Sequence, residues 1–243
     1  MNRLPTLLLL LMISTPATAQ VIYTDWLWHE WEVTPFGGAS FLGHSRNFVT
    51  PTIGVPGGIR TVGMRYGSGY MVGVNCRQNL GDYWAADLQY TFANQPLEFT
   101  NISPDLPTLG LSHTISNFSY NGTYHFQSYS HRFLPYVRAG GGASLFFLEG
   151  GSERRAEAAL GVRLRDSWTP TFSYGGGFQY LFDDLVGVTF DARDTISSVP
   201  SYGLPKSAAV VNGVFFPGIA RDGVLHNFQV NFGLTIRWDD WVR

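Results

Sequence analysis

The segment that most constrains the fold of this chain is residues 226–238, near the C-terminus, because it alternates between apolar and polar residues throughout. Successive side chains of a β-strand point to opposite faces, so the alternation assigns one set of residues to each face. One face holds Phe228, Val230, Phe232, Leu234, Ile236 and Trp238, and the other holds Asn227, Gln229, Asn231, Gly233, Thr235 and Arg237. Such a segment predicts a strand with one apolar and one polar face.

The same alternation recurs in seven further segments, which makes eight predicted strands. They span residues 31–43, 60–76, 83–92, 114–127, 135–148, 171–182, 186–194 and 226–238. Short turns follow the second, fourth and sixth segments, whereas long loops follow the first, third, fifth and seventh. This arrangement is typical of bacterial outer-membrane barrels. The sequence therefore predicts an all-β fold: an eight-stranded antiparallel up-and-down transmembrane β-barrel with short periplasmic turns and long extracellular loops.

The alternative architecture is a secreted, soluble barrel whose apolar faces line the core. The polar faces would then form the exterior, but they are rich in Gly, Ser, Thr and Asn and poor in Lys and Glu. Soluble exteriors carry more Lys and Glu than this. The inward glycines would also not supply the large apolar interior that a soluble barrel needs. The pattern therefore favours an apolar exterior that faces lipid, with aromatic girdles near the strand ends.

The N-terminus has the features of a secretory signal peptide. Arg3 supplies the positive charge, residues 7–12 form an apolar run, and residues 17–19 read Ala-Thr-Ala, a small-residue cleavage site. We expect a signal peptide over 1–19 with cleavage near Ala19, a short lead over 20–30, the barrel over 31–238 and a short tail over 239–243.

The single cysteine, Cys76, excludes an intramolecular disulfide, and a formal net charge of -2 predicts no basic face for nucleic acid.

Assigning faces by alternation places seven charged residues toward the inside of the barrel. They are Glu32, Asp87, Asp191, Arg65, Arg138, Arg193 and Arg237. An eight-stranded barrel has an interior just wide enough for side chains to fill, and charges at that depth are costly unless they are paired. We therefore predict a lumenal ion-pair network. It either fills and rigidifies the lumen, or acts as a gate whose rearrangement opens a narrow pore.

The connections between the predicted strands are informative mainly through their length. Residues 77–82 are assigned to a tight turn, and residues 149–168 and 195–223 to long extracellular loops. Within the first of these loops, residues 152–160 predict either a helical turn or two, or an extension of the flanking strands. Loops on a rigid scaffold commonly carry binding functions, but the sequence of these loops names no ligand.

Candidate catalytic residues are few. The adjacent Ser/His pairs at loop or rim positions include Ser112-His113 and His44-Ser45. Neighbouring side chains of a strand point apart, so neither pair forms a nucleophile and its base by itself. No Cys/His cluster has the spacing of a zinc site. We therefore expect a protein that is not an enzyme, without catalytic residues, cofactor or metal.

The closing segment resembles the β-signal that the barrel-assembly machinery reads. Asn231, Gly233, Ile236 and Trp238 carry the pattern here, although a short tail follows Trp238. Residues 83–92 and 136–144 also resemble the glycine- and aromatic-rich strands of the small outer membrane protein β-barrel domain family, of the OmpA transmembrane domain and OmpX type. The resemblance implies a monomer integral to the bacterial outer membrane. Its partners would be the lipid bilayer, lipopolysaccharide and, during biogenesis, the barrel-assembly machinery.

Members of that family serve as structural proteins, small pores, adhesins or, in a few cases, enzymes that act on lipid A. The peptidoglycan-binding domain of OmpA has no counterpart in this chain. The main hypothesis is a non-enzymatic barrel with a structural or surface-binding role through its extracellular loops, whose ligand the sequence does not identify. The alternatives are a narrow gated pore for small solutes and a lipid A-modifying enzyme.

Overall fold

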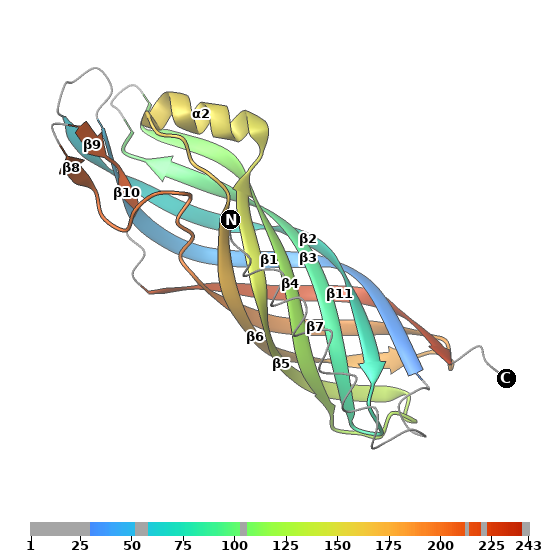
Figure 1. Cartoon of the computed structure of the whole chain (residues 1–243). Coiled ribbons are helices and arrows are strands. Elements are labelled where there is room, and N and C mark those ends of the chain that lie inside the picture. Colours follow the sequence, from blue (N-terminus) through green and yellow to red (C-terminus); the bar gives the residue numbers. More distant parts are fainter. Residues whose placement is uncertain (1–29, 52–57, 103–105, 212–213, 220–222, 240–243) are drawn as a thin grey trace.

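The computed structural model describes residues 30–51, 58–102, 106–211, 214–219 and 223–239 (Figure 1). The predicted signal peptide and most of the predicted lead and tail lie outside these residues. Eight long strands dominate the fold: β1 (Glu30–Pro51), β2 (Ile59–Asn79), β3 (Trp84–Thr100), β4 (Thr108–His125), β5 (Phe133–Leu148), β6 (Ser167–Leu181), β7 (Val186–Ser198) and β11 (Val224–Asp239). The smaller elements are α2 (Gly150–Leu160), β8 (Ala209–Val211), β9 (Val214–Phe216) and β10 (Gly218–Ile219).

The sheet closes on itself because β1 pairs with both β2 and β11. Val33, for example, lies opposite Cys76 of β2 on one side and Ile236 of β11 on the other. Each of the other long strands pairs with its neighbours in the order β11-β7-β6-β5-β4-β3-β2, and every pairing is antiparallel. The predicted eight-stranded antiparallel barrel is therefore confirmed. Closure leaves no long strand edge unpaired, as lipid requires.

Strands β1 to β4 extend farther than alternation predicted. The segment 44–58 was predicted to be a loop, but β1 continues to Pro51, which lies opposite Ile59 of β2. Likewise β3 reaches Thr100 rather than residue 92, where it pairs with Thr108 of β4. These long hairpins project from the long-loop end of the barrel, where α2 and β8–β10 also lie (Figure 1). The sheet of the barrel is thus longer at this end than the predicted strand ranges.

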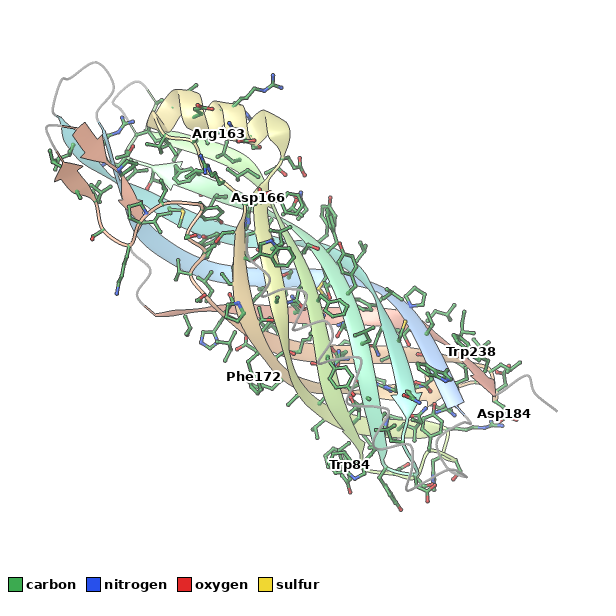
Figure 2. The ribbon with its side chains drawn as sticks, in the orientation of Figure 1. Trp84, Arg163, Asp166, Phe172, Asp184 and Trp238 are labelled. Atoms are coloured by element: carbon green, nitrogen blue, oxygen red, sulfur yellow. The ribbon has the colours of Figure 1, made fainter. Side chains whose placement is uncertain are left out.

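The outer wall of the barrel carries the large apolar side chains. Tyr70 and Phe232 are 61% and 59% exposed, and aromatic residues such as Trp84, Phe172 and Trp238 stand out from the wall in Figure 2. Polar residues of the alternating set, such as Thr34 and Gln229, are buried inside. The apolar exterior predicted for a lipid-facing barrel is confirmed. No helix among the described residues is long and apolar enough to cross a membrane.

The inside of the extracellular half is apolar, which the sequence analysis did not predict. Alternation placed Arg65 inside and therefore Val62, Met64 and Tyr66 of the same strand on the lipid face, but these three side chains are almost completely buried inside the barrel. Between Tyr66 and Tyr70 the pairing of β2 with β3 shifts, because the three residues 67–69 of β2 lie opposite only residues 95–96 of β3. An extra residue of this kind is a β-bulge, and it exchanges the two faces of the strand on either side of it.

Candidate functional site

The lumen contains the candidate site, and its periplasmic half is built around three carboxylates. Glu32 accepts hydrogen bonds from Arg237 Nε at 2.6 Å, from Gln179 Nε2 at 3.0 Å and from the Tyr129 hydroxyl, and it forms an ion pair with Arg77 at 3.4 Å. The Arg237 guanidinium also lies 3.6 Å from the centre of the Tyr129 ring. These contacts join β1, β2, β6, β11 and the turn after β4 across the barrel.

The second carboxylate, Asp87 on β3, lies beside the first cluster. It accepts a hydrogen bond from Arg77 Nε at 2.7 Å, from Asn75 at 3.3 Å and from the Thr123 hydroxyl, and Arg138 Nη1 lies 3.9 Å away. Arg77 thus connects Glu32 to Asp87, and Arg138 connects Asp87 to the third carboxylate.

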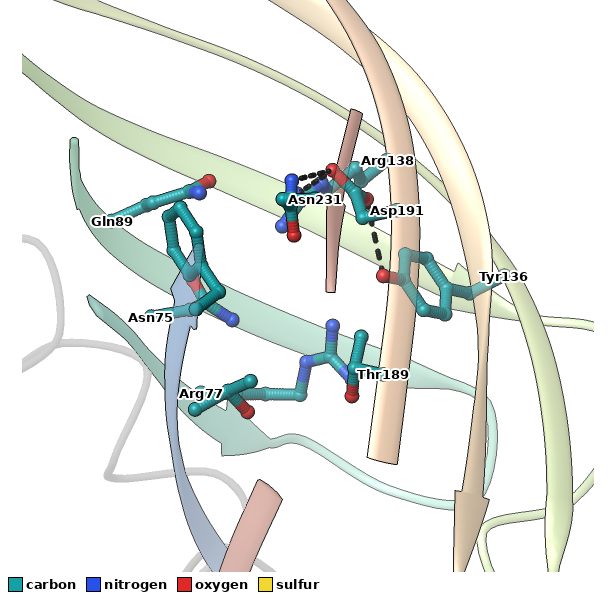
Figure 3. A pocket seen from close by; sticks show the side chains of 10 residues that line it. Asn75, Arg77, Gln89, Tyr136, Arg138, Thr189, Asp191 and Asn231 are labelled. Carbon is teal, nitrogen blue, oxygen red and sulfur yellow. Dashed lines mark hydrogen bonds and ion pairs between the residues drawn. The ribbon is translucent and has the colours of Figure 1, made fainter. Parts of the chain in front are cut away.

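The third carboxylate, Asp191 on β7, accepts hydrogen bonds from three side chains. Arg138 Nη2 and Asn231 donate to its Oδ1, Asn231 at 3.1 Å, while the Tyr136 hydroxyl donates to Oδ2 at 3.1 Å (Figure 3). All three carboxylates are at most 1% exposed. Their pairing matters because an unpaired charge at this depth would cost several kcal/mol.

Arg193 differs from the other buried arginines because its three hydrogen bonds all go to neutral groups. Its Nε donates to Gln229 at 2.7 Å, its Nη1 to Gln89 Oε1 and its Nη2 to Thr91 at 3.0 Å. No carboxylate of the described residues forms an ion pair with it. We use "lumenal network" for Glu32, Asp87, Asp191, Arg77, Arg138, Arg193 and Arg237.

Six of the seven charged residues that alternation placed inside lie in the lumenal network, and Arg65 does not. Arg65 is exposed, since the bulge that turned Tyr66 inward turned its neighbour outward, so its predicted lumenal position was wrong. Arg77 was missed because residues 77–82 were assigned to a turn, whereas β2 continues to Asn79. The alternation of the same strand carried the signal, because Asn75 and Arg77 share a face.

Above the network, the extracellular mouth is closed by an apolar core. Tyr202, from the loop after β7, is fully buried there and lies within hydrogen-bond distance of Tyr66 at 3.2 Å and of His113 Nε2 at 3.0 Å. Leu160 of α2 and Ile219 of β10 are fully buried in the same core. We call this packed region the "mouth core"; its other members include Leu42, Met64, Leu97, Phe99, Leu111, Phe146 and Leu225.

Helix α2 covers the mouth core. Its sequence is rich in Ala, Glu and Arg, which are good helix formers, and it ends at Gly161 in the left-handed conformation. Side chains of the barrel satisfy its last carbonyls: the Thr50 hydroxyl donates to Leu160 O at 2.6 Å and Arg60 Nη2 to Ala159 O at 2.9 Å. Of the two structures predicted for residues 152–160, the helix is therefore the one that forms.

The Ser/His pairs do not form a catalytic arrangement in the described part of the chain. His113 points into the mouth core toward Tyr202, while the Ser112 hydroxyl accepts a hydrogen bond from Asn94 at 3.0 Å. The side chains of His44 and Ser45 lie outside the described ones. Among the described residues, no group of three or more His, Cys, Asp or Glu residues could hold a metal ion.

The four residues of the predicted assembly signal lie on β11 and divide between its faces. Asn231 points into the lumen, where it contacts Asp191, while Ile236 and Trp238 face outward. Gly233 faces inward where the strands lie close together: a Cβ there would be 2.6 Å from Thr34 Cγ2 and 2.8 Å from the Pro35 carbonyl oxygen. A role in assembly stays a prediction, and residues 240–243 of the tail lie outside the described residues.

Comparison with known proteins identifies the family. The family model described as "Outer membrane protein beta-barrel domain" matches residues 6–237. No curated protein matches the chain. Among solved structures, the outer membrane protein AlkL is 16% identical with a TM-score of 0.50, and the match covers 90% of this chain and 94% of AlkL. Neisserial surface protein A is 10% identical, with coverage of 86% and 97% and a TM-score of 0.47.

Escherichia coli outer membrane protein W is 16% identical, with coverage of 87% of this chain and 98% of that protein and a TM-score of 0.36. At these identities the structural matches concern the fold alone. The family match, however, spans almost the whole chain, and the closed barrel with its apolar outer wall agrees with it. The chain belongs to the outer membrane protein β-barrel domain family and is an integral protein of the outer membrane.

Proposed function

We propose that this protein is a non-enzymatic, monomeric outer-membrane barrel with a closed lumen, which acts structurally or by binding at the cell surface through its extracellular loops. The observation that carries the proposal is that two different fillings occupy the lumen in series. The mouth core fills the extracellular half, and the lumenal network crosses the periplasmic half.

Each filling opposes the passage of solutes for its own physical reason. The mouth core is mostly apolar, and the polar atoms of Tyr66, Tyr202 and His113 within it lie within hydrogen-bond distance of one another. It therefore offers a hydrated ion little in place of its water, and hydrophobic constrictions of this kind block conduction. The lumenal network ties opposite walls of the barrel together, as in the contact of Glu32 on β1 with Gln179 on β6. A solute would have to break several charge-assisted hydrogen bonds at once to pass.

The extracellular end presents a structured, charged surface suited to binding. Helix α2 is anchored by Ser152, Ala156 and Leu160, which leaves Arg154, Arg155 and Glu157 exposed. Surfaces displayed on loops above a rigid scaffold commonly carry function. We expect lipopolysaccharide to surround the barrel at this end and the barrel-assembly machinery to read β11 during insertion.

Single-channel conductance in a planar bilayer tests the proposal. The refolded protein should insert without steady openings, because both fillings block the lumen. A folded barrel that conducts steadily would contradict it. Folding is checked independently by the heat-dependent shift in gel mobility that outer-membrane barrels show.

The second candidate is a narrow gated pore, and the specific observation that favours it is the polar periplasmic half of the lumen. If the network were the gate, the double substitution Arg138→Ala and Arg193→Ala would open steady conductance. The closed-barrel proposal instead expects the double variant to be less stable and still silent, because the mouth core remains. Unchanged melting together with unchanged conductance would contradict any role of the network, as filling or as gate.

A further inference from the structure

The charges of the lumenal network do not balance. All the charged side chains that are buried among the described residues belong to it: the carboxylates Glu32, Asp87 and Asp191, and the guanidiniums of Arg77, Arg138, Arg193 and Arg237. One positive charge is therefore in excess. Arginine stays protonated in proteins, so the barrel cannot remove this charge by releasing a proton. An uncompensated charge inside a barrel is costly, which calls for a counter-charge.

The excess charge lies with Arg193, whose hydrogen-bond partners are all neutral. One of them, Gln89, reaches across the lumen from β3 to β7 and accepts from Arg193 through its side-chain oxygen. The other end of that amide, Nε2, is buried and forms no hydrogen bond with any described residue. An amide whose oxygen accepts a hydrogen bond from a cation is polarised, so its N–H groups become stronger donors.

A lumenal cavity lies beside this amide. Gln89, Asn75, Arg77, Arg138, Asp191 and Asn231 are among its lining residues (Figure 3). It has room for about one particle the size of a water molecule. Two guanidiniums and one carboxylate line it, and all the carboxylate's contacts are already taken up by Arg138, Asn231 and Tyr136. The cavity is therefore lined by two cations and one anion, and two polar atoms of its lining residues, the donor Gln89 Nε2 and the acceptor Asn75 Oδ1, form no hydrogen bond with any described residue.

We propose that this cavity binds one small monovalent inorganic anion, of the halide class, as the counter-charge of the lumenal network. The Gln89 amide and the guanidiniums of Arg77 and Arg138 would surround the ion. The dimensions of the cavity select a single-atom anion over an oxyanion such as sulfate. Neutralising the lumen in this way stabilises the folded barrel, because the ion binds the folded state alone.

The test measures unfolding temperature by tryptophan fluorescence in detergent micelles, in sodium chloride, sodium bromide or sodium sulfate of matched ionic strength. Chloride and bromide should raise the midpoint saturably, by about 2–4 °C. Sulfate should give only the unsaturable rise that excluded salts produce. If the unfolding midpoint depended on concentration in the same way in all three salts, the proposal would be overturned.

The substitution Gln89→Glu adds the missing negative charge next to Arg193 at almost unchanged volume. It should raise the unfolding temperature in halide-free buffer and abolish the halide dependence. The matched control is Gln78→Glu, which makes the same chemical change on the outer face of β2 and should keep the halide dependence. A Gln89→Glu variant that responds to halide as the Gln78→Glu control does would refute the site.

A second measurement does not depend on the variants folding. Crystals of the unmodified protein grown with bromide should show an anomalous-scattering peak between Gln89, Arg77 and Arg138. An ordered water without anomalous signal at that position would overturn the proposal.

Discussion

At the scale of single residues, Glu32 is the side chain on which most of the lumenal network depends. It receives contacts from Arg77, Arg237, Gln179 and Tyr129. Glu32→Gln keeps its shape but leaves two buried guanidiniums facing a neutral group, which should lower the free energy of unfolding by about 3–5 kcal/mol. Urea unfolding in lipid vesicles measures the change. Glu98→Gln, on the exposed face of β3, is the matched control and should have little effect.

Asp183 makes a second residue-scale prediction, at the periplasmic turn between β6 and β7. Its Oδ1 accepts backbone N–H bonds from Leu185 at 2.9 Å and Val186 at 2.7 Å, and these bonds lower the pKa of its carboxyl below the ordinary value. A folded-state pKa below the unfolded one means that the carboxylate contributes stability at neutral pH, which is lost as pH falls through the acidic range.

Asp183→Asn should therefore reduce stability near neutral pH. The difference in stability between this variant and the unmodified protein should become smaller as the pH falls toward 4, roughly the ordinary carboxyl pKa. Asp184→Asn is the matched control in the same turn and should reduce stability less than Asp183→Asn does. Urea midpoints measured from pH 7 to about 3 provide the comparison. Identical profiles for the two variants would show that the turn bonds do not act this way.

At the scale of elements, the loop after β7 contributes Tyr202 to the mouth core. Tyr202 adopts a left-handed backbone conformation with φ 47°, its carbonyl accepts from Arg165 N at 2.9 Å, and Ser201 N donates to the Ser167 hydroxyl at 2.9 Å. These contacts connect the loop to the segment after α2, so both extracellular segments hold Tyr202 in the mouth core.

Removing that anchor should release the loop. Lys206, the single lysine of the chain, lies four residues beyond Tyr202 and gives a lysine-specific protease one cleavage site. We expect Tyr202→Ala to accelerate cleavage at least about tenfold, which corresponds to roughly 1.4 kcal/mol of lost local stability. Tyr202→Phe, which keeps the ring, is the control and should be cleaved more slowly than Tyr202→Ala. Equal cleavage rates for the two variants would show that the Tyr202 ring does not hold the loop.

At the scale of the whole molecule, local alternation predicted the barrel but not what fills it. The strand count, the lipid-facing wall and the inward positions of Glu32, Asp87 and Asp191 all follow from a period of two. The bulge in β2 interrupts that period, which is why Arg65 and Tyr66 were assigned to the wrong faces. A bulge is set by the pairing of β2 with its neighbours rather than by the residues of β2 alone.

The mouth core could not be predicted from the sequence for a similar reason. Tyr202 and Leu160 lie in segments that read as extracellular loops, and nothing local indicates that they fold back to meet Met64 and Leu97. Their burial depends on contacts between segments distant in the sequence. The lumen as a whole is therefore a tertiary property, in which two fillings of different chemistry lie in series.

The measurement that tests this account most directly is the conductance of barrels in which each filling is removed separately and then together. The substitutions are Tyr202→Ala with Leu160→Ala for the mouth core, and Arg138→Ala with Arg193→Ala for the network. Fillings in series predict that the unmodified protein and both single-filling variants stay silent, while the combined variant shows steady openings. Steady conductance in the unmodified protein, or in either single-filling variant at the level of the combined one, would contradict a lumen closed at two levels.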